Sequence, residues 1–241
     1  MSAVFTLGPG VRASFTDRYE GGRSLGSYAA LNLGLGVGDD PEAVIENRKI
    51  AAAARGIDAS RVVWMNQVHG RDVAVVTEPG NAGRVDAVVT TQRDLVLAAM
   101  AADCLPILAA DAGAGVVGAA HAGRAGMLAG VASALVEEMV RNGADPAATV
   151  AVLGPAVCGG CYEVPDHMWR EAVTVVAEAG CRTHRGSSGI DLRAAVTVQL
   201  QQAGIGQIRS DERCTFETPE LFSHRRDAPT GRFAGYVWQS S

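Results

Sequence analysis

The sequence predicts an α+β fold, because strand-like and helix-like segments both occur but do not alternate strictly along the chain. Six strand-like runs follow one another over residues 61–120 without a helix between them, and most helix-like segments come later. Several of these runs are almost wholly apolar, which is typical of strands covered on both faces. No internal repeat or low-complexity linker divides the 241 residues, so we expect one domain over residues 1–241.

The elements follow from local signals along the chain. Residues 13–38 are rich in glycine, serine and asparagine and are expected to form an ordered loop region. A helix is expected over residues 41–55, because Asp40 is a good N-cap, Pro41 suits the first helical position and Gly56 is a natural stop. Strands are expected at 61–65, 71–77, 85–90, 95–101, 105–110 and 115–120. The remaining elements are a helix at 127–141, a strand at 149–153, a helix at 166–178 and a helix capped by Asp191 that runs to Ala203.

Composition and charge exclude several classes of protein. Hydrophobic residues make up 48% and charged residues 20%, as in globular proteins and unlike disordered ones. The net charge of −5 argues against nucleic-acid binding, which needs a basic surface. No signal peptide and no apolar run of about 20 residues is found, so no membrane span is expected. The odd number of five cysteines favours reduced thiols in the cytoplasm, and the oligomeric state is left open.

Three motifs at the ends of predicted strands place metal-binding side chains beside turns. They are Asn66-Gln67-Val68-His69-Gly70, Ala102-Asp103-Cys104-Leu105-Pro106 and His121-Ala122-Gly123-Arg124-Ala125-Gly126. His69, Cys104 and His121 match a catalytic zinc site, in which three protein ligands leave a fourth position for water or substrate. Their spacings are non-local and fit no short metal motif. The same residues are therefore also compatible with two ordinary polar histidines and a buried thiol, or with a Cys104 nucleophile and a histidine base.

Further candidates lie beside these motifs and among the arginines. Asp103 precedes Cys104 directly, so on an extended strand it points to the opposite face; if the strand ends there, it can serve as a base or hold a ligand. A purely structural hydrogen bond is the alternative. Lys49 is the only lysine, which leaves arginine as the practical anion binder. Arg48, Arg225 and Arg226 are the candidates for binding phosphate or carboxylate, and we add Asn47, next to Arg48, as a substrate-binding residue.

The segment Cys158-Gly159-Gly160-Cys161 has the CxxC spacing of redox and metal sites. It has no second CxxC beside it and opens no predicted helix, so we interpret its glycines as a turn after Gly154-Pro155 and assign it no redox function. His167 and His184 lie in polar surroundings typical of surface histidines. His224, directly before the arginine pair that begins with Arg225, is kept as a candidate.

The motifs, taken in order, resemble those of one known family. The matching segments are Gly21–Ser24, Tyr28–Gly34, Val37–Pro41, Glu46–Arg48, Gln67–Gly70, Ala102–Pro106, His121–Gly123, Gly154–Pro155, Cys161–Val164, Asp191–Leu192, Cys214–Thr215 and Phe222–Ser223. On these segments, the chain resembles the YfiH family of purine nucleoside phosphorylases, long described as polyphenol oxidoreductases or laccases. The resemblance runs from about Phe15 to Asp227.

The resemblance implies a fold, a metal and an activity. The fold would be a mixed β-sandwich flanked by helices, similar to the catalytic domain of cytotoxic necrotizing factor. His69, Cys104 and His121 would hold zinc, with copper as the less favoured metal. The enzyme would cleave adenosine, inosine, guanosine and S-methyl-5′-thioadenosine with phosphate, and it would deaminate adenosine. Arg48 or Arg225 would orient the phosphate, and Asp103 would move protons.

Three other functions fit the same residues. A copper-dependent polyphenol oxidase could use the same three ligands, although the chain holds only five histidines. A cysteine hydrolase or deamidase would use Cys104 with a histidine base. A non-catalytic quality-control factor of cell-wall synthesis would not need the three ligands at all.

The chain departs from the family pattern in three places. The family's His-Ala-Gly-Trp-Arg-Gly is His121-Ala122-Gly123-Arg124-Ala125-Gly126 here, so the tryptophan is missing. Of the paired cysteines before Tyr-Glu-Val only Cys161 is in place, and Cys158 is additional. His224 replaces the usual tyrosine before the paired arginines. None of these changes removes one of the three proposed ligands.

Overall fold

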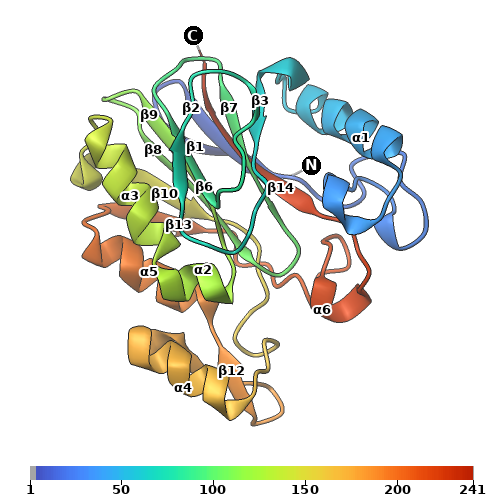
Figure 1. Ribbon diagram of the computed structural model, residues 1–241, viewed down its shortest axis with the longest axis vertical. Helices are drawn as coiled ribbons and strands as arrows, with labels where there is room; N and C mark the ends of the chain where they lie inside the picture. Colours follow the sequence, from blue (N-terminus) through green and yellow to red (C-terminus); the bar gives the residue numbers. More distant parts are fainter. Residues whose placement is uncertain (1–3, 241) are drawn as a thin grey trace.

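Two six-stranded sheets packed face to face form the centre of the protein in the computed structural model, which describes residues 4–240 (Figure 1). In the first sheet the order is β1 (Val4–Gly8), β2 (Val11–Phe15), β14 (Phe233–Gln239), β7 (Val96–Ala101), β3 (Val62–Trp64) and β5 (Gly80–Asn81). In the second it is β13 (Gln207–Ser210), β10 (Val150–Leu153), β8 (Leu105–Asp111), β9 (Val116–Ala122), β6 (Ala87–Thr90) and β4 (Val73–Val75). Both sheets mix parallel and antiparallel pairs, which confirms the predicted α+β class.

Apolar side chains on alternate residues give each sheet two buried faces. In β7, Leu97 and Ala99 point into the core between the sheets, whereas Val96 and Ala98 point to the outer face of the first sheet. In β8, Leu108 faces the space between the sheets and Ile107 the outer face of the second sheet. The prediction of strands covered on both faces is therefore confirmed.

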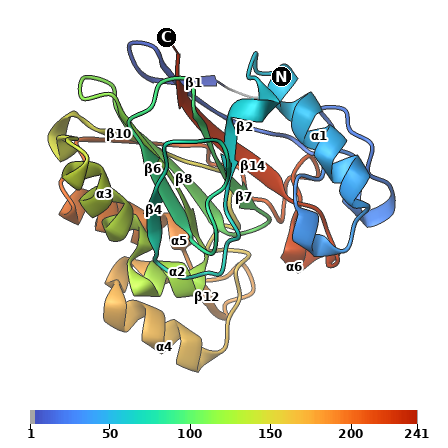
Figure 2. The ribbon, with the colours of Figure 1, turned by 45° about the horizontal axis from the view of Figure 1, so that its top comes forward.

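Helices cover the outer faces of the sandwich (Figure 1, Figure 2). α1 (Pro41–Ala53) packs Ala51 and Ala52 against the outer face of the first sheet. α2 (Arg124–Ala129), α3 (Val131–Arg141) and α5 (Leu192–Gln202) lie over the second. α4 (Asp166–Val175) and the hairpin β11 (Gly180–Arg182) and β12 (Ser188–Ile190) project at one end, and α6 (His224–Asp227) is a single turn. Short 3-10 helices occupy 26–28, 35–37, 59–61, 146–148 and 177–179.

The predicted elements are found with a few corrections. One helix was expected over residues 127–141, but the chain forms α2 and α3, because Gly130 has φ 82° and ψ 39° and interrupts the helix. The helix expected over 166–178 ends at Val175 and continues as a 3-10 turn. Residues 13–15, expected in a loop, belong to β2. Among residues 4–240, no helix has both the length and the apolar character needed to cross a membrane.

Candidate metal centre and its cavity

The structure brings His69, Cys104 and His121 together at one end of the sandwich. Their ligand atoms all lie within 4.8 Å of one another. His69 is in the loop after β3, Cys104 directly precedes β8, and His121 lies near the end of β9. The antiparallel register of β8 and β9 pairs Pro106 with His121, which places the start of one strand beside the end of the other. Strand pairing thus joins residues that are far apart in the sequence.

Asp86 anchors two of the three ligands and is completely buried. Its carboxylate accepts the backbone N–H groups of Val68, His69 and Gly70 at 2.7–3.1 Å, and it lies 2.9 Å from Nδ1 of His121. These bonds hold His69 in the left-handed region at φ 62°, which non-glycine residues seldom adopt. The contact to Nδ1 leaves Nε2 of His121 for a metal, as in carboxylate–histidine–metal arrangements.

Gly123 allows the three ligands to approach one another. A Cβ at this position would lie 2.8 Å from Cδ2 of His69 and 2.9 Å from Sγ of Cys104. The backbone of Gly123 itself is extended, with φ −79° and ψ 177°, so any residue could adopt its conformation. Space, rather than backbone freedom, therefore requires glycine in this motif.

The charges of the three ligands stabilise one another. Burial alone would raise the pKa of the Cys104 thiol, but His121 and His69 lower it to about 6. Burial alone would lower the pKa of His121, but the Cys104 thiolate and the hydrogen bond to Asp86 raise it to about 9. Two imidazoles and a thiolate with one anchored ring form a donor set that fits Zn²⁺ or a copper ion.

A cavity of about 1000 Å³ opens in front of the three ligands. Arg48, one of the predicted phosphate binders, lines it and stacks on the Trp64 ring, with the guanidinium carbon 3.8 Å from the ring centroid. Burial lowers the pKa of Arg48 to about 10. Arg225 also lines the cavity and lies over Tyr162 at 4.9 Å. The cavity therefore combines a metal-binding end with cationic and aromatic walls.

Asp103 lies beside the cavity and is committed to two hydrogen bonds. Its φ of 90° ends the strand pattern and turns the residue toward the site. One carboxylate oxygen accepts the Thr215 hydroxyl at 2.6 Å, and the other accepts the backbone N–H of Arg225 at 2.7 Å. Asp103 thus fastens the segment that carries Arg225 to the loop that carries Cys104.

Asn47, predicted to bind substrate, does not line the cavity. It is completely buried, and its amide donates to Ser24, Ala30 and Asn32 while accepting the N–H of Arg23. Asn47 is therefore not placed to bind a substrate in the cavity, because its side chain holds together the loop before α1. Its neighbour Arg48 reaches the cavity instead.

Two other arginines singled out in the sequence serve the scaffold. Arg226 donates to the carbonyl groups of Thr215, Phe216, Thr218 and Leu221 and so ties the 215–221 segment together. Arg124, in the altered His-Ala-Gly motif, pairs with Glu171 at 2.7 Å and does not line the cavity.

Several site residues escaped sequence reasoning. Asp86 belongs to none of the three motifs, and the only local signal is an acidic residue directly before an apolar strand. Arg232 and Trp64 also line the cavity, but each comes from a part of the chain in which no motif was recognised. Tyr162 lay within a recognised segment, but nothing in the sequence alone indicated that it faces Arg225.

Comparisons with known proteins agree with this geometry. Residues 12–240 match the family model described as multi-copper polyphenol oxidoreductase laccase. A purine nucleoside phosphorylase of Streptomyces coelicolor is 52% identical over 95% of this chain and 96% of its own length. The purine nucleoside phosphorylase YfiH of Escherichia coli is 41% identical over 95% and 94%.

Solved structures have the same fold. The crystal structure of YlmD from Geobacillus stearothermophilus matches with a TM-score of 0.89 and 34% identity, over 97% of this chain and 93% of that one. A hypothetical YfiH protein of Bacillus licheniformis matches with a TM-score of 0.88 and 32% identity, over 95% and 92%. From its sequence, its sandwich fold and its His-Cys-His group, the chain belongs to the YfiH family of laccase-domain proteins.

Proposed function

We propose that the protein is a metal-dependent purine nucleoside phosphorylase. The observation that carries this proposal is the position of His69, Cys104 and His121 at one end of a cavity whose walls carry buried or stacked arginines. Relatives at 41–53% identity carry the name purine nucleoside phosphorylase. The proposed substrates are adenosine, inosine, guanosine and S-methyl-5′-thioadenosine, together with inorganic phosphate. Free thiols at all five cysteines suit the cytoplasm as its location.

Phosphorolysis breaks the bond between C1′ of the ribose and N9 of the purine. A phosphate oxygen forms the new bond to C1′, and the base leaves with the bonding electrons and gains a proton, giving ribose 1-phosphate. The sugar carries positive charge in the transition state, as in glycoside hydrolysis. The protein must therefore hold the phosphate close to C1′ and neutralise the leaving base.

Arg48 is the best placed residue to hold phosphate. Its Nε donates to the carbonyl of Leu33 at 2.9 Å, and the Trp64 ring fixes the plane of the guanidinium group. Nη2 also donates to the weak acceptor Sδ of Met100 at 3.8 Å, and the remaining N–H groups of the two terminal nitrogens can contact an anion. Arg232 adds a further cation to the same cavity, and burial lowers its pKa against the opposing effect of Cys104 and Asp103.

The purine is assigned to the side of the cavity lined by Tyr162. The guanidinium group of Arg225 lies over the phenol ring, and this stacked pair offers a flat surface for the base. Asp103 is the cavity carboxylate that can exchange a proton with the base. The metal, when bound at the three ligands, supplies Lewis-acid polarisation of the reacting group. The same arrangement would serve deamination of adenosine, with Asp103 moving the protons.

Product-resolved turnover tests the proposal. Purified protein of known metal content would be incubated with adenosine or inosine, with and without phosphate, and the products separated by chromatography. We expect phosphate-dependent release of adenine or hypoxanthine, which is lost in His69→Ala and in metal-free protein and restored by Zn²⁺. Release without phosphate, or full activity in His69→Ala, would contradict the proposal.

The role of Asp103 is tested by Asp103→Asn. We expect kcat of both phosphorolysis and deamination to fall, because an amide cannot transfer the proton that each reaction needs. A residue that only fastens Thr215 and Arg225 would instead raise KM for both reactions and leave kcat unchanged.

One observation favours a second function, a cysteine hydrolase. Cys104, His121 and Asp86 form a thiol–imidazole–carboxylate series, with 2.9 Å between Nδ1 of His121 and Asp86. Such an enzyme would keep its activity after treatment with a chelator and lose it after thiol alkylation. A metal enzyme loses activity in both treatments, and only the chelator effect is reversed by added Zn²⁺.

A further inference from the structure

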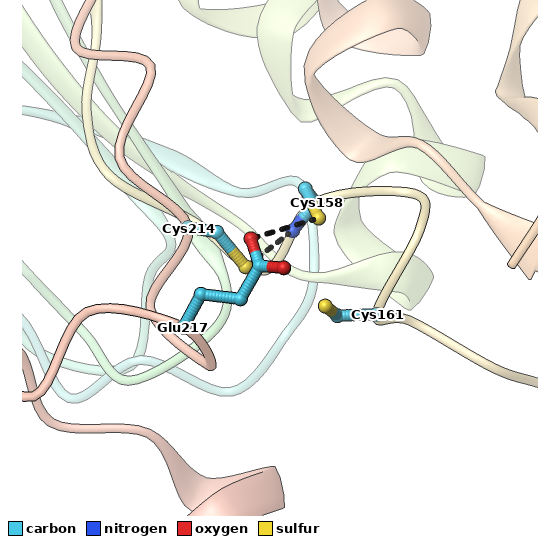
Figure 3. Close-up of side chains that lie close together, drawn as sticks. All are labelled: Cys158, Cys161, Cys214 and Glu217. Atoms are coloured by element: carbon cyan, nitrogen blue, oxygen red, sulfur yellow. Dashed lines mark hydrogen bonds between the residues drawn. The ribbon is translucent and has the colours of Figure 1, made fainter. Parts of the chain in front are cut away.

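A second group of metal-binding side chains lies outside the cavity. Cys158 and Cys161, from the loop between β10 and α4, meet Cys214 and Glu217, from the segment between β13 and α6 (Figure 3). Their ligand atoms all lie within 4.8 Å of one another. Sγ of Cys158 is 4.0 Å from Oε2 of Glu217, and Sγ of Cys214 accepts the backbone N–H of Cys158 at 3.3 Å.

Backbone hydrogen bonds hold these side chains in place. Ala156 pairs with Cys214 in a β-bridge, and Thr215 donates its N–H to the carbonyl of Ala156 at 3.1 Å. A tight turn joins the two cysteines of the CxxC, because the N–H of Cys161 donates to Cys158 at 3.0 Å. Arg226 holds the 215–221 segment through four carbonyl groups. The backbone of these two segments therefore brings the four side chains together.

We propose that Cys158, Cys161, Cys214 and Glu217 form a second metal site, which binds Zn²⁺ with four protein ligands. Three thiolates and one carboxylate complete a tetrahedral coordination, the arrangement found in structural zinc sites. The CxxC pair supplies two ligands as in such sites, and the fold, rather than a short spacing in the sequence, brings Cys214 and Glu217 to them. The group at the cavity differs, since it offers only three ligands and leaves a position open.

The chemistry of the four donors favours a cation over a disulfide. A disulfide between two of the cysteines would leave the third sulfur and Glu217 without a role. Three thiolates and a carboxylate carry four negative charges, and a dication reduces this charge by half. His184 lies beside this group, with its Nε2 3.6 Å from the other carboxylate oxygen of Glu217. Zinc binding at neutral pH would release the thiol protons to solvent.

The second site would brace one wall of the cavity. Thr215, next to Cys214, donates its hydroxyl to Asp103 at 2.6 Å. Val157, next to Cys158, donates its N–H to the carbonyl of Asp103 at 3.0 Å and lines the cavity. Tyr162, next to Cys161, lines it as well. Each cysteine of the second site is thus the sequence neighbour of a residue that forms or supports the cavity wall.

Metal content is the first test, and it does not depend on enzymatic activity. Full-length protein purified in the presence of Zn²⁺ and a reductant is expected to hold two zinc ions per chain. The double variant Cys158→Ser, Cys161→Ser should hold one, and His69→Ala should also hold one. Cys181→Ser is the matched control, because Cys181 lies near Gly159 but outside the group of four, and it should keep two.

Cobalt spectroscopy identifies the site that is filled. In His69→Ala, Co²⁺ should give an intense sulfur-to-cobalt charge-transfer band of a site with three thiolates, whereas the single Cys104 at the cavity can supply only one. Glu217→Gln keeps the three thiolates and should retain this band, but it should bind Co²⁺ more weakly because one of the four ligands is lost. It is the variant to use if the double variant does not fold, with the weaker binding of Co²⁺ as the measured effect.

Three outcomes would overturn the proposal. They are one zinc ion per wild-type chain that the double variant retains, a His69→Ala protein that binds neither Zn²⁺ nor Co²⁺, and a disulfide between two of the three cysteines in protein purified with a reductant. None of them would bear on phosphorolysis, which depends on the other site. Conversely, loss of nucleoside turnover in His69→Ala would leave the second site unaffected.

Discussion

Asp86 determines the geometry of two of the three candidate metal ligands although it does not line the cavity. The variant Asp86→Asn should lower metal affinity about 10- to 100-fold, because an amide cannot accept three N–H groups and also orient His121. Competition with a chromophoric chelator measures this affinity.

Asp111 provides the control for this prediction. It is also buried, and it accepts the backbone N–H groups of Gly113, Ala114 and Asp145 at the far end of β8. Asp111→Asn should lower the thermal stability and leave metal affinity unchanged. Equal affinities in the two variants would show that Asp86 acts only on folding.

The Cys104 thiol of metal-free protein should react as a thiolate near neutral pH. The positive charge of His121 lowers the pKa of Cys104 to about 6, so its rate of alkylation should be constant above that pH and fall as the pH decreases through about 6. Burial raises the pKa of Cys181 to about 11, which makes it an internal control that reacts only in alkali. Peptide mass spectrometry resolves the two rates, and equal profiles would contradict the prediction.

At this scale, the sequence indicated the three candidate metal ligands that the structure brings together, but not the residue that supports them. His69, Cys104 and His121 could be found because each combines a metal-binding side chain with a turn signal. Asp86 acts through contacts that exist only after β6 and β9 have paired, so no local pattern marks it. Asn47 illustrates the opposite error, since a polar residue beside Arg48 proved to be a buried link within a loop.

The ends of α2 provide a prediction at the scale of the element. Both ends are glycines, and each is required for a different reason. Gly130→Ala should lower the free energy of unfolding by about 1–2 kcal/mol, because alanine is strained at φ 82°. No clash adds to this cost, since nothing lies within 4 Å of the new Cβ. Gly123→Ala should instead lower metal binding, since its Cβ would displace His69 and Cys104.

Urea unfolding and metal titration of both variants separate the two effects. Metal loss in Gly130→Ala, or full metal binding in Gly123→Ala, would contradict this assignment. The comparison needs no further control, because the same chemical change is made at both ends of one helix.

At the level of elements, the sequence indicated the helices and the strands of residues 61–120 more clearly than the strands near the two ends of the chain. α1 was predicted from Asp40 and Pro41, and the structure confirms its start. The break at Gly130 was missed, because the apolar pattern continues across it and only the backbone conformation reveals it. β14 was missed as well: it lies between β2 and β7, and a strand at the end of the chain has no neighbouring strand in sequence to suggest it.

The whole sandwich depends on the layer between its sheets. Leu108 is completely buried there and packs over Gly235 of β14, where a Cβ would lie 3.1 Å from it. Leu108→Ala should lower the free energy of unfolding by about 2–5 kcal/mol through the cavity that it leaves. Urea denaturation measures this change, and metal content should not change. A loss of less than about 1 kcal/mol would show that the sheets can close over the gap.

The overall class could be predicted because strongly apolar runs in a non-alternating order admit few arrangements. The assignment of residues 1–241 to a single domain remains a prediction. The stacking of the two sheets depends on contacts between residues far apart in the sequence, so no local pattern predicts it. The sandwich was expected only from the resemblance to a known family. The structural matches confirm that expectation.

The candidate ligands at the cavity come from segments that are distant in the chain. A metal bound by them would therefore make the stability of the folded chain depend on the concentration of free metal. His69 and Cys104 are 35 residues apart, so an unfolded chain offers a metal no ready pair of these ligands. A metal that binds the folded chain alone favours it by mass action, by about 1.4 kcal/mol for each tenfold excess of free metal over Kd. If the proposed site binds its metal, chains left without the ion would unfold more often and be exposed to proteolysis, so the amount of intact protein would follow the availability of the ion.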